Sequence, residues 1–169
     1  MKYDDARNQL IQTWGQLSSQ WGISRTMGQI HAVLMVSPNP LTADDIIAEL
    51  HISRGNVSMN LRNLLEWGII QKIFMPGDRK EYYSAEKDPW RLALQIARER
   101  KRRELEPVIQ ALQTLQDIED EPGKERETQE LQQMTTQLLD VAMQVDKLIE
   151  VGIRSGGPTI IRKLINVLR

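Results

Sequence analysis

The sequence predicts a mainly α-helical protein with one small β-hairpin. Apolar residues recur every three or four positions along most of the 169 residues, which is typical of amphipathic helices. The spacing changes to every second residue only after Gly68, where a short pair of strands is expected. A regular heptad pattern from Leu131 onward predicts a long helix. Together these observations predict a small domain with a long helical appendage.

The first two helices are expected over residues 3–21 and 24–36. The second stops before Pro38 and Pro40, because proline cannot continue a helix. The first helix ends near Gly22, and its apolar residues form one stripe. These are Tyr3, Leu10, Trp14, Leu17 and Trp21.

Two short helices follow. Thr42, with an acid three residues later at Asp45, predicts a capped helix start. Ser53 begins the next helix, which places Val57 and Leu61 on its inner side and ends at Gly68. Because only about three residues join them, the pair is a predicted helix-turn-helix.

A β-hairpin is expected directly after this motif. Residues 69–75 and 81–84 alternate in polarity, and Pro76-Gly77-Asp78-Arg79-Lys80 between them has turn composition. A hairpin behind a helix-turn-helix is the order of a winged-helix domain, which we place at residues 23–88.

The remaining chain is expected to fold as a long antiparallel helical hairpin. One helix begins at Pro89, capped by Asp88, and runs to about Ile118 with a kink or interruption at Pro107. A turn at Glu121-Pro122-Gly123 leads into the helix that carries the heptad pattern. A break at residues 155–158 precedes a last short helix.

Residues 1–22 and 89–169 are therefore predicted to form a dimerisation region. The apolar positions expected at the interface are Leu10, Trp14, Leu17, Leu131, Met134, Leu138, Val141, Val145, Leu148, Ile161, Leu164 and Leu168. Gly152 continues the same heptad series.

Composition argues against several classes of protein. The chain has no Cys and two His, so a metal site or a cysteine nucleophile is not expected. We find no Ser/His/Asp arrangement and no paired carboxylates, so neither an enzyme nor a cofactor is expected. No apolar run reaches about 18 residues and no signal peptide is apparent, so a cytoplasmic protein is expected.

Charge is unevenly distributed although Lys and Arg (22) nearly balance Asp and Glu (23). Residues 53–80 hold five bases and two acids, whereas residues 115–130 hold two bases and seven acids. A basic helix-turn-helix and hairpin favour double-stranded DNA as partner. The predicted DNA contacts are Thr42, Ser53, Arg54, Gly55, Asn56, Ser58, Met59, Arg62, Asn63, Arg79 and Lys80.

Alternatives stay open at this point. The polar face of the helix at Ser53 and the charges of the hairpin tip could simply be solvated. The run from Arg98 to Arg103 could touch phosphates or form a solvated section of helix.

Several segments resemble the GbsR-type branch of the MarR-like winged-helix transcriptional regulators. They are Ile23-Ser24-Arg25-Thr26-Met27-Gly28-Gln29-Ile30, Leu41-Thr42-Ala43-Asp44-Asp45-Ile46, Ser53-Arg54-Gly55-Asn56-Val57-Ser58-Met59-Asn60-Leu61-Arg62 and Pro76-Gly77-Asp78-Arg79-Lys80-Glu81-Tyr82-Tyr83. The resemblance covers about residues 20–105. It implies a homodimer that binds DNA through residues 53–67 and the wing, and repression more often than activation.

The sequence thus predicts a repressor that binds a pseudo-palindromic operator as a homodimer. The alternative is a winged-helix module that binds protein and not DNA. Some members of the branch resemble regulators of choline and glycine betaine genes, so a quaternary ammonium effector is a further hypothesis. Its pocket would use Trp14, Trp21, Trp67 and Trp90, although tryptophan at helical spacing is also typical of a core.

Overall fold

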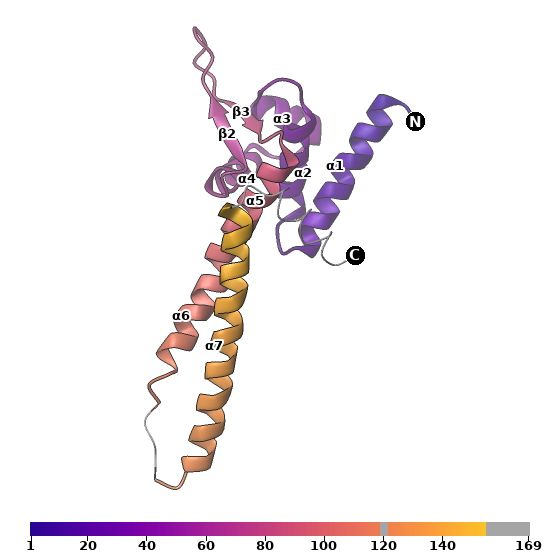
Figure 1. The fold of residues 1–169 in the computed structure, drawn as a ribbon. Helices are drawn as coiled ribbons and strands as arrows, with labels where there is room; N and C mark the ends of the chain where they lie inside the picture. Colours follow the sequence, from indigo (N-terminus) through magenta and orange to yellow (C-terminus); the bar gives the residue numbers. More distant parts are fainter. Residues whose placement is uncertain (119–121, 155–169) are drawn as a thin grey trace, which may run out of the picture. The chain divides into compact units, whose positions relative to one another are not determined.

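The computed structural model describes residues 1–118 and 122–154. It is mostly helical with a small antiparallel sheet, which confirms the predicted fold class (Figure 1). The chain divides into two compact units, Met1–Leu92 and Ala93–Arg169, and each is considered by itself.

The first unit begins with helices α1 (Tyr3–Gln20) and α2 (Arg25–Val36), which pack closely together. Small residues allow the close approach. A Cβ atom added to Gly28 would lie 2.6 Å from the Cβ of Ser18 and 3.1 Å from the Cα of Gly15. The predicted apolar stripe is therefore only partly in the packing face, where Trp14 packs beside Ile11 against Ala32 and Val33 of α2. The buried positions of α1 are Ile11, Gly15 and Ser18.

The exposed part of the predicted stripe has a physical explanation. Leu10 and Trp21 are exposed, whereas Trp14 and Leu17 are half-buried. Where two helices cross at glycine and serine, little apolar side-chain surface is buried. The spacing of apolar residues therefore does not show where α1 contacts α2. The sequence pattern instead marks a second face of α1, part of which is left uncovered.

Helices α3 (Ala43–Leu50) and α4 (Arg54–Glu66) form the predicted helix-turn-helix. The predicted cap of α3 is a complete capping box. The hydroxyl of Thr42 accepts a hydrogen bond from the Asp45 amide at 3.2 Å, and the Asp45 carboxylate accepts one from the Thr42 amide at 2.8 Å. The Thr42 hydroxyl also donates to the Asp45 carboxylate at 2.7 Å, and the bonds from the Thr42 hydroxyl and amide lower the pKa of Asp45.

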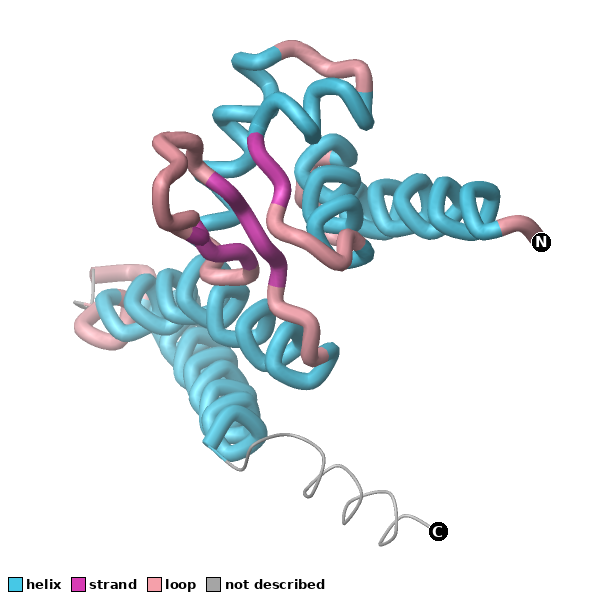
Figure 2. Tube along the Cα trace, turned by 90° about the horizontal axis from the view of Figure 1, so that it is seen from above, coloured by secondary structure: helices cyan, strands magenta, loops and turns pink. Residues whose placement is uncertain are grey.

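The sheet has three strands in the order β1-β3-β2, all antiparallel (Figure 2). Strands β2 (Ile70–Ile73) and β3 (Tyr82–Ala85) are the predicted hairpin, with Ile73 opposite Tyr82. Strand β1 (Leu41–Thr42) pairs with β3 and was not predicted, because two residues are too few to show an alternation.

The core of the first unit lies between α2, α3, α4 and the sheet. Its most buried side chains include Ile30, Val33, Leu34, Ile46, Val57 and Leu64. Lys87 ties the chain after β3 to the end of α2. Its Nζ atom donates to the carbonyl oxygens of Leu34 at 2.8 Å and Ser37 at 2.6 Å, where a cation complements the helix dipole.

The second unit contains most of α5 (Pro89–Arg100), the π-helical segment η1 (Lys101–Leu105), α6 (Glu106–Thr114) and α7 (Glu125–Arg154). The interruption predicted at Pro107 is confirmed. Proline has no amide to donate back along the helix, and the π-turn directly before α6 absorbs the mismatch. At the start of α5, Asp88 caps the helix by accepting from the Trp90 amide at 2.8 Å.

Helices α6 and α7 run antiparallel, as predicted (Figure 1). The side of α7 that is buried against its neighbours carries Thr128, Thr135 and Ala142. The heptad residues are not on that side. Six of them, Leu131, Met134, Leu138, Val141, Val145 and Leu148, are between 41% and 72% exposed. The heptad residues of α7 therefore do not form the contact between the helices of the hairpin within one chain.

Three predicted features lie wholly or partly outside the described residues. The break at Ser155-Gly156-Gly157-Pro158 and the last helix with Ile161, Leu164 and Leu168 are outside them. The predicted turn at residues 121–123 is described only for Pro122 and Gly123, which form a turn with a φ of +88° at Gly123.

Candidate nucleic-acid interface

Helix α4 exposes one polar side. Its buried side consists of Val57, Asn60, Leu61 and Leu64. The amide group of Asn60 donates to the carbonyl oxygen of Asn56 at 2.8 Å and to its side-chain oxygen at 2.6 Å. Asn56 is thus tied to its own helix. The side chains of Ser58, Met59 and Arg62 and the backbone at Gly55 face away from the core and are exposed.

The first turn of α4 is fixed by Ser53 and Arg54. The hydroxyl of Ser53 accepts a hydrogen bond from the Asn56 amide at 3.3 Å, which caps the helix. The Arg54 guanidinium donates to the Asp44 carboxylate of α3 at 2.5 Å. Both side chains stay open to solvent, at 73% and 67% exposed. Arg54 therefore sits at the accessible end of α4 with its direction set by α3.

Gly55 has no packing role in the chain. A Cβ atom added there meets no atom within 4 Å, and the residue is helical. Glycine inside a helix costs about 1 kcal/mol relative to alanine. Because the fold gains nothing from this glycine, the open space in front of it is the feature that suits a closely approaching ligand.

The hairpin tip, which we call the wing, is an ordered structure. The Asp78 amide donates to the Met75 carbonyl at 3.1 Å, with Pro76 and Gly77 between them and a φ of +83° at Gly77. This is the arrangement of a type II turn. The Asp78 carboxylate accepts from the Lys80 amide at 2.9 Å and from the Tyr82 hydroxyl at 2.8 Å.

These bonds also shift two pKa values. The hydrogen bonds from the Lys80 amide and the Tyr82 hydroxyl lower the pKa of Asp78, and the same Asp78 bond raises the pKa of Tyr82. At the base of the wing, Lys72 and Glu81 form an ion pair across the strands at 2.6 Å. Arg79 and Lys80 remain exposed on the loop.

Two further residues of the predicted contact set also have structural roles. Thr42 is the half-exposed cap of α3, and Asn63 is half-buried in α4 with its carbonyl oxygen accepting the Trp67 amide at 2.9 Å. Sequence reasoning missed the contact of Asp44 with Arg54 and the exposure of Phe74 beside the wing turn. The acid pair Asp44-Asp45 was visible in the sequence, but only Asp45 had a recognisable capping role.

The basic run from Arg98 to Arg103 is engaged within the second unit. Glu99 is buried and binds Arg102 at 2.6 Å and also Arg103, and this lowers its pKa. Lys101 reaches α7, where it pairs with Asp146 at 3.1 Å and Glu150 at 3.2 Å. The run is therefore largely neutralised by acids of its own helical hairpin.

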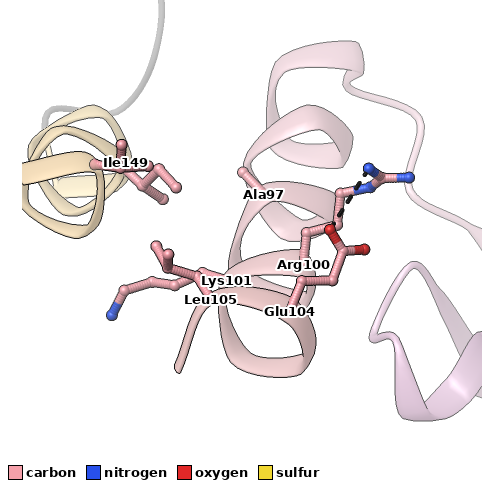
Figure 3. Close-up of a pocket in the computed structure, with 7 residues that line it drawn as sticks. Ala97, Arg100, Lys101, Glu104, Leu105 and Ile149 are labelled. Atoms are coloured by element: carbon pink, nitrogen blue, oxygen red, sulfur yellow. Dashed lines mark ion pairs between the residues drawn. The ribbon is translucent and has the colours of Figure 1, made fainter. Parts of the chain in front are cut away.

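A hollow lies beside this network. Figure 3 shows Arg100 and Glu104 paired on one side of it and Ile149 of α7 on the other. Its volume is about 450 Å³. The lining is mostly apolar and comprises Ala97, Arg100, Lys101, Glu104, Leu105, Val145 and Ile149.

Two of the four tryptophans, Trp14 and Trp90, lie within helices, and the other two, Trp21 and Trp67, directly follow the ends of α1 and α4. The rings of Trp14 and Trp21 meet edge to face with centroids 6.4 Å apart. Trp14 also donates from Nε1 to Nδ1 of the buried His31 at 3.1 Å, and burial lowers the pKa of His31 to about 4. Trp67 is buried at the end of α4, and Trp90 is exposed in the first turn of α5.

Two further observations concern other classes of site. Within residues 1–118 and 122–154, no group of three or more His, Cys, Asp or Glu side chains could hold a metal ion. No helix in that part of the chain has the length and apolar character needed to cross a membrane.

An exposed helix α4 behind α3, followed by an antiparallel wing, defines a winged helix-turn-helix protein. Residues 21–81 match the model of the MarR family. The HTH-type transcriptional repressor GbsR of Bacillus subtilis (strain 168) is 24% identical over 138 residues, which cover 81% of this chain and 76% of that protein. The HTH-type transcriptional repressor OpcR of the same organism is 24% identical over 85 residues, about half of each chain.

A solved structure described as a transcriptional regulator has the same fold. It has a TM-score of 0.57 and 19% sequence identity, and it covers 83% of this chain and 95% of that one. These comparisons agree with the predicted resemblance to the GbsR-type branch of the MarR-like winged-helix regulators, and the family match itself covers residues 21–81.

Proposed function

We propose that this protein is a transcriptional repressor that binds operator DNA in the cytoplasm through α4 and the wing. The observation that carries the proposal is the accessible side of α4, where Gly55 leaves open space and Arg54 is held at the helix start. Arginine binds guanine with two hydrogen bonds in the major groove, and a helix of this size fits that groove. The names of the two Bacillus repressors support the same conclusion.

The basic wing supports a second contact. Arg79 and Lys80 lie on an ordered loop, and the neighbouring turn is stabilised by hydrogen bonds of Asp78. A wing tip of this kind fits the minor groove, whose negative potential attracts arginine. Contacts from α4 would read bases, whereas contacts from the wing would follow groove shape and phosphate position.

Substitutions in α4 and the wing test this division of labour. Arg54→Ala should lose about 1–3 kcal/mol of binding free energy and relax base preference at one position in each half-site. Arg79→Ala should weaken binding more evenly across sequences. Equal losses of specific and nonspecific binding in both variants would contradict base reading by Arg54. Competition binding against a duplex selected from a random pool measures both.

A Gly55→Ala variant tests the open space directly. The substitution should stabilise α4 by up to about 1 kcal/mol, because alanine is the better helix former and meets no clash. Operator affinity should nevertheless fall, since the added methyl group occupies the approach to DNA. Unchanged affinity in this more stable variant would contradict a close approach at Gly55.

We also propose that the repressor is a homodimer. The exposed heptad face of α7 supports this, because a monomer rarely leaves so continuous an apolar surface in water. The exposed apolar residues of α1, such as Leu10, are the second candidate surface. Two-fold symmetry would place two recognition helices about 34 Å apart on a pseudo-palindrome.

The effector hypothesis remains part of the proposal. Support comes from the paired rings of Trp14 and Trp21, which resemble two walls of an aromatic site for a quaternary ammonium. Tryptophan fluorescence and operator affinity should change on titration with choline or glycine betaine. No change in either signal at millimolar concentration would remove this ligand class and leave the DNA-binding proposal intact.

The alternative function, a protein-binding winged helix, predicts a different response to salt. Binding that neutralises phosphates weakens steeply with salt, with a logarithmic slope of about −0.9 for each contact. An absence of any salt-sensitive DNA binding would favour the alternative.

A further inference from the structure

Phe74 is the only phenylalanine of the chain, and it is 81% exposed. It follows the last residue of β2 directly and precedes Met75, which is also exposed. Figure 1 shows the loop between β2 and β3 extending beyond the helices of the first unit. A side chain that is 81% exposed buries little apolar area on folding, so most of the Phe74 ring is free to contact a partner.

The exposure of Phe74 belongs to an ordered segment. Ile73, the residue before it, pairs with Tyr82 at the end of the ladder. Met75, the residue after it, accepts the hydrogen bond that closes the turn from Asp78. Phe74 is therefore held between a strand and a turn, and its ring is presented at little cost in conformational entropy.

The charges around Phe74 fit a polyanion. The acids of the hairpin have partners inside it, Asp78 with Tyr82 and Glu81 with Lys72. Across the part of the chain that the structure describes, Arg79 and Lys80 have no acid within ion-pair distance. An exposed ring on the same hairpin loop as two available cations is complementary to a DNA groove, where phosphates line the edges and stacked bases lie between them.

We propose that Phe74 is an apolar wedge that enters the minor groove beside Arg79 and partly unstacks one base step, which bends the operator. Apolar side chains used in this way kink DNA towards the major groove. The proposal rests on the proposed DNA-binding function. It adds a source of specificity, because flexible pyrimidine–purine steps are the easiest to open.

The test compares wild type with Phe74→Ala and Phe74→Leu on a duplex that wild type selects from a random pool. Energy transfer between dyes at the duplex ends reports bending, and 2-aminopurine at the step under the wing reports unstacking. Wild type and Phe74→Leu should raise both signals. Phe74→Ala should lose both and bind roughly tenfold more weakly, within the range that stacking contacts contribute.

The control is Arg79→Ala, which should weaken binding while the bound duplex keeps its bend. Thermal melting of Phe74→Ala should match wild type, because the ring is exposed. Bending and 2-aminopurine signals unchanged in Phe74→Ala would overturn the wedge and leave the DNA-binding function standing. If Phe74→Ala leaves DNA bending unchanged and instead abolishes binding of a partner protein, the wedge is likewise overturned. If wild type selects no duplex at all, the proposed function fails and the wedge fails with it.

Discussion

The two units of this protein differ in how they bury their side chains. The first unit has a core of fully buried Ile, Leu and Val side chains from α2, α3 and α4. Among the described residues beyond Leu92, the buried ones are Glu99, Thr128, Thr135 and Ala142, which are charged, polar or small. Most large apolar residues of α7, including Leu131, Leu138 and Leu148, are exposed instead.

This difference teaches which part of the chain depends on a partner. A unit with its own apolar core gains its stability from the hydrophobic effect within one chain. A helical hairpin that buries threonine, alanine and ion pairs gains less, and its outward apolar face is a further source of stability on association. The first unit is thus the self-sufficient one, and the helical unit is the one with an apolar face open to association.

The largest contrast is expected from core truncation. Leu34→Ala removes a buried side chain of α2 and should lower the free energy of unfolding by about 2–5 kcal/mol. The matched variant Leu148→Ala removes a side chain that is 72% exposed, so a monomer should change by less than about 0.5 kcal/mol. Urea titration at dilute protein measures both. Equal losses would contradict the contrast between the units.

Polar substitutions on α7 should abolish assembly. Leu138→Asp with Val141→Asp places two carboxylates in the middle of the exposed apolar face, where a dimer would have to bury them. Sedimentation at micromolar concentration should show a dimer for wild type and a monomer for this variant. Gln133→Asp, on a different side of α7, is the control and should remain dimeric. If the wild-type protein is a monomer, the heptad face of α7 is not a dimer interface.

Stability of the second unit should depend on pH through its ion pairs. Binding to Arg102 and Arg103 makes the pKa of Glu99 lower in the folded chain than its ordinary value of 4.5. Ionised Glu99 therefore stabilises the fold above pH 4.5, and this contribution is lost as pH falls through the lowered value. Thermal melting followed by circular dichroism should show a smaller acid-induced decrease in Glu99→Gln than in wild type. The same decrease in both would contradict the assignment.

The smallest effect is expected at the capping box of α3. Thr42→Ala removes the hydroxyl that accepts the Asp45 amide and should cost about 1 kcal/mol. Thr42→Ser keeps the acceptor and should restore most of this stability. If alanine and serine behave alike, the cap contributes nothing to the first unit.

The sequence predicted the first unit well because strong local signals mark its elements. Thr42 and Ser53 begin helices, Pro38 and Pro40 end one, and the Pro76-Gly77 turn fixes the hairpin. The strand β1 and the small-residue crossing at Gly28 escaped prediction, because both depend on a partner distant in sequence. For the same reason the heptad pattern of α7 showed an apolar face without showing which surface covers it.

The candidate site was predicted in outline and not in its contacts. Periodicity showed which side of α4 faces outward, since Val57 and Leu61 fix the buried side. It could not show that Asp44 holds Arg54 or that Asn60 ties down Asn56, because side-chain hydrogen bonds leave no period in a sequence. Phe74 drew no separate prediction, because it lies within the apolar run Ile73-Phe74-Met75 of an expected strand.

The most direct test is a fluorescence anisotropy titration of the selected duplex with wild type over a series of salt concentrations. The account predicts saturation at two chains per site and a logarithmic salt slope of roughly −4 or steeper, because two copies would each neutralise several phosphates. Saturation at one chain per site, or a slope near zero, would contradict operator binding by a winged-helix dimer.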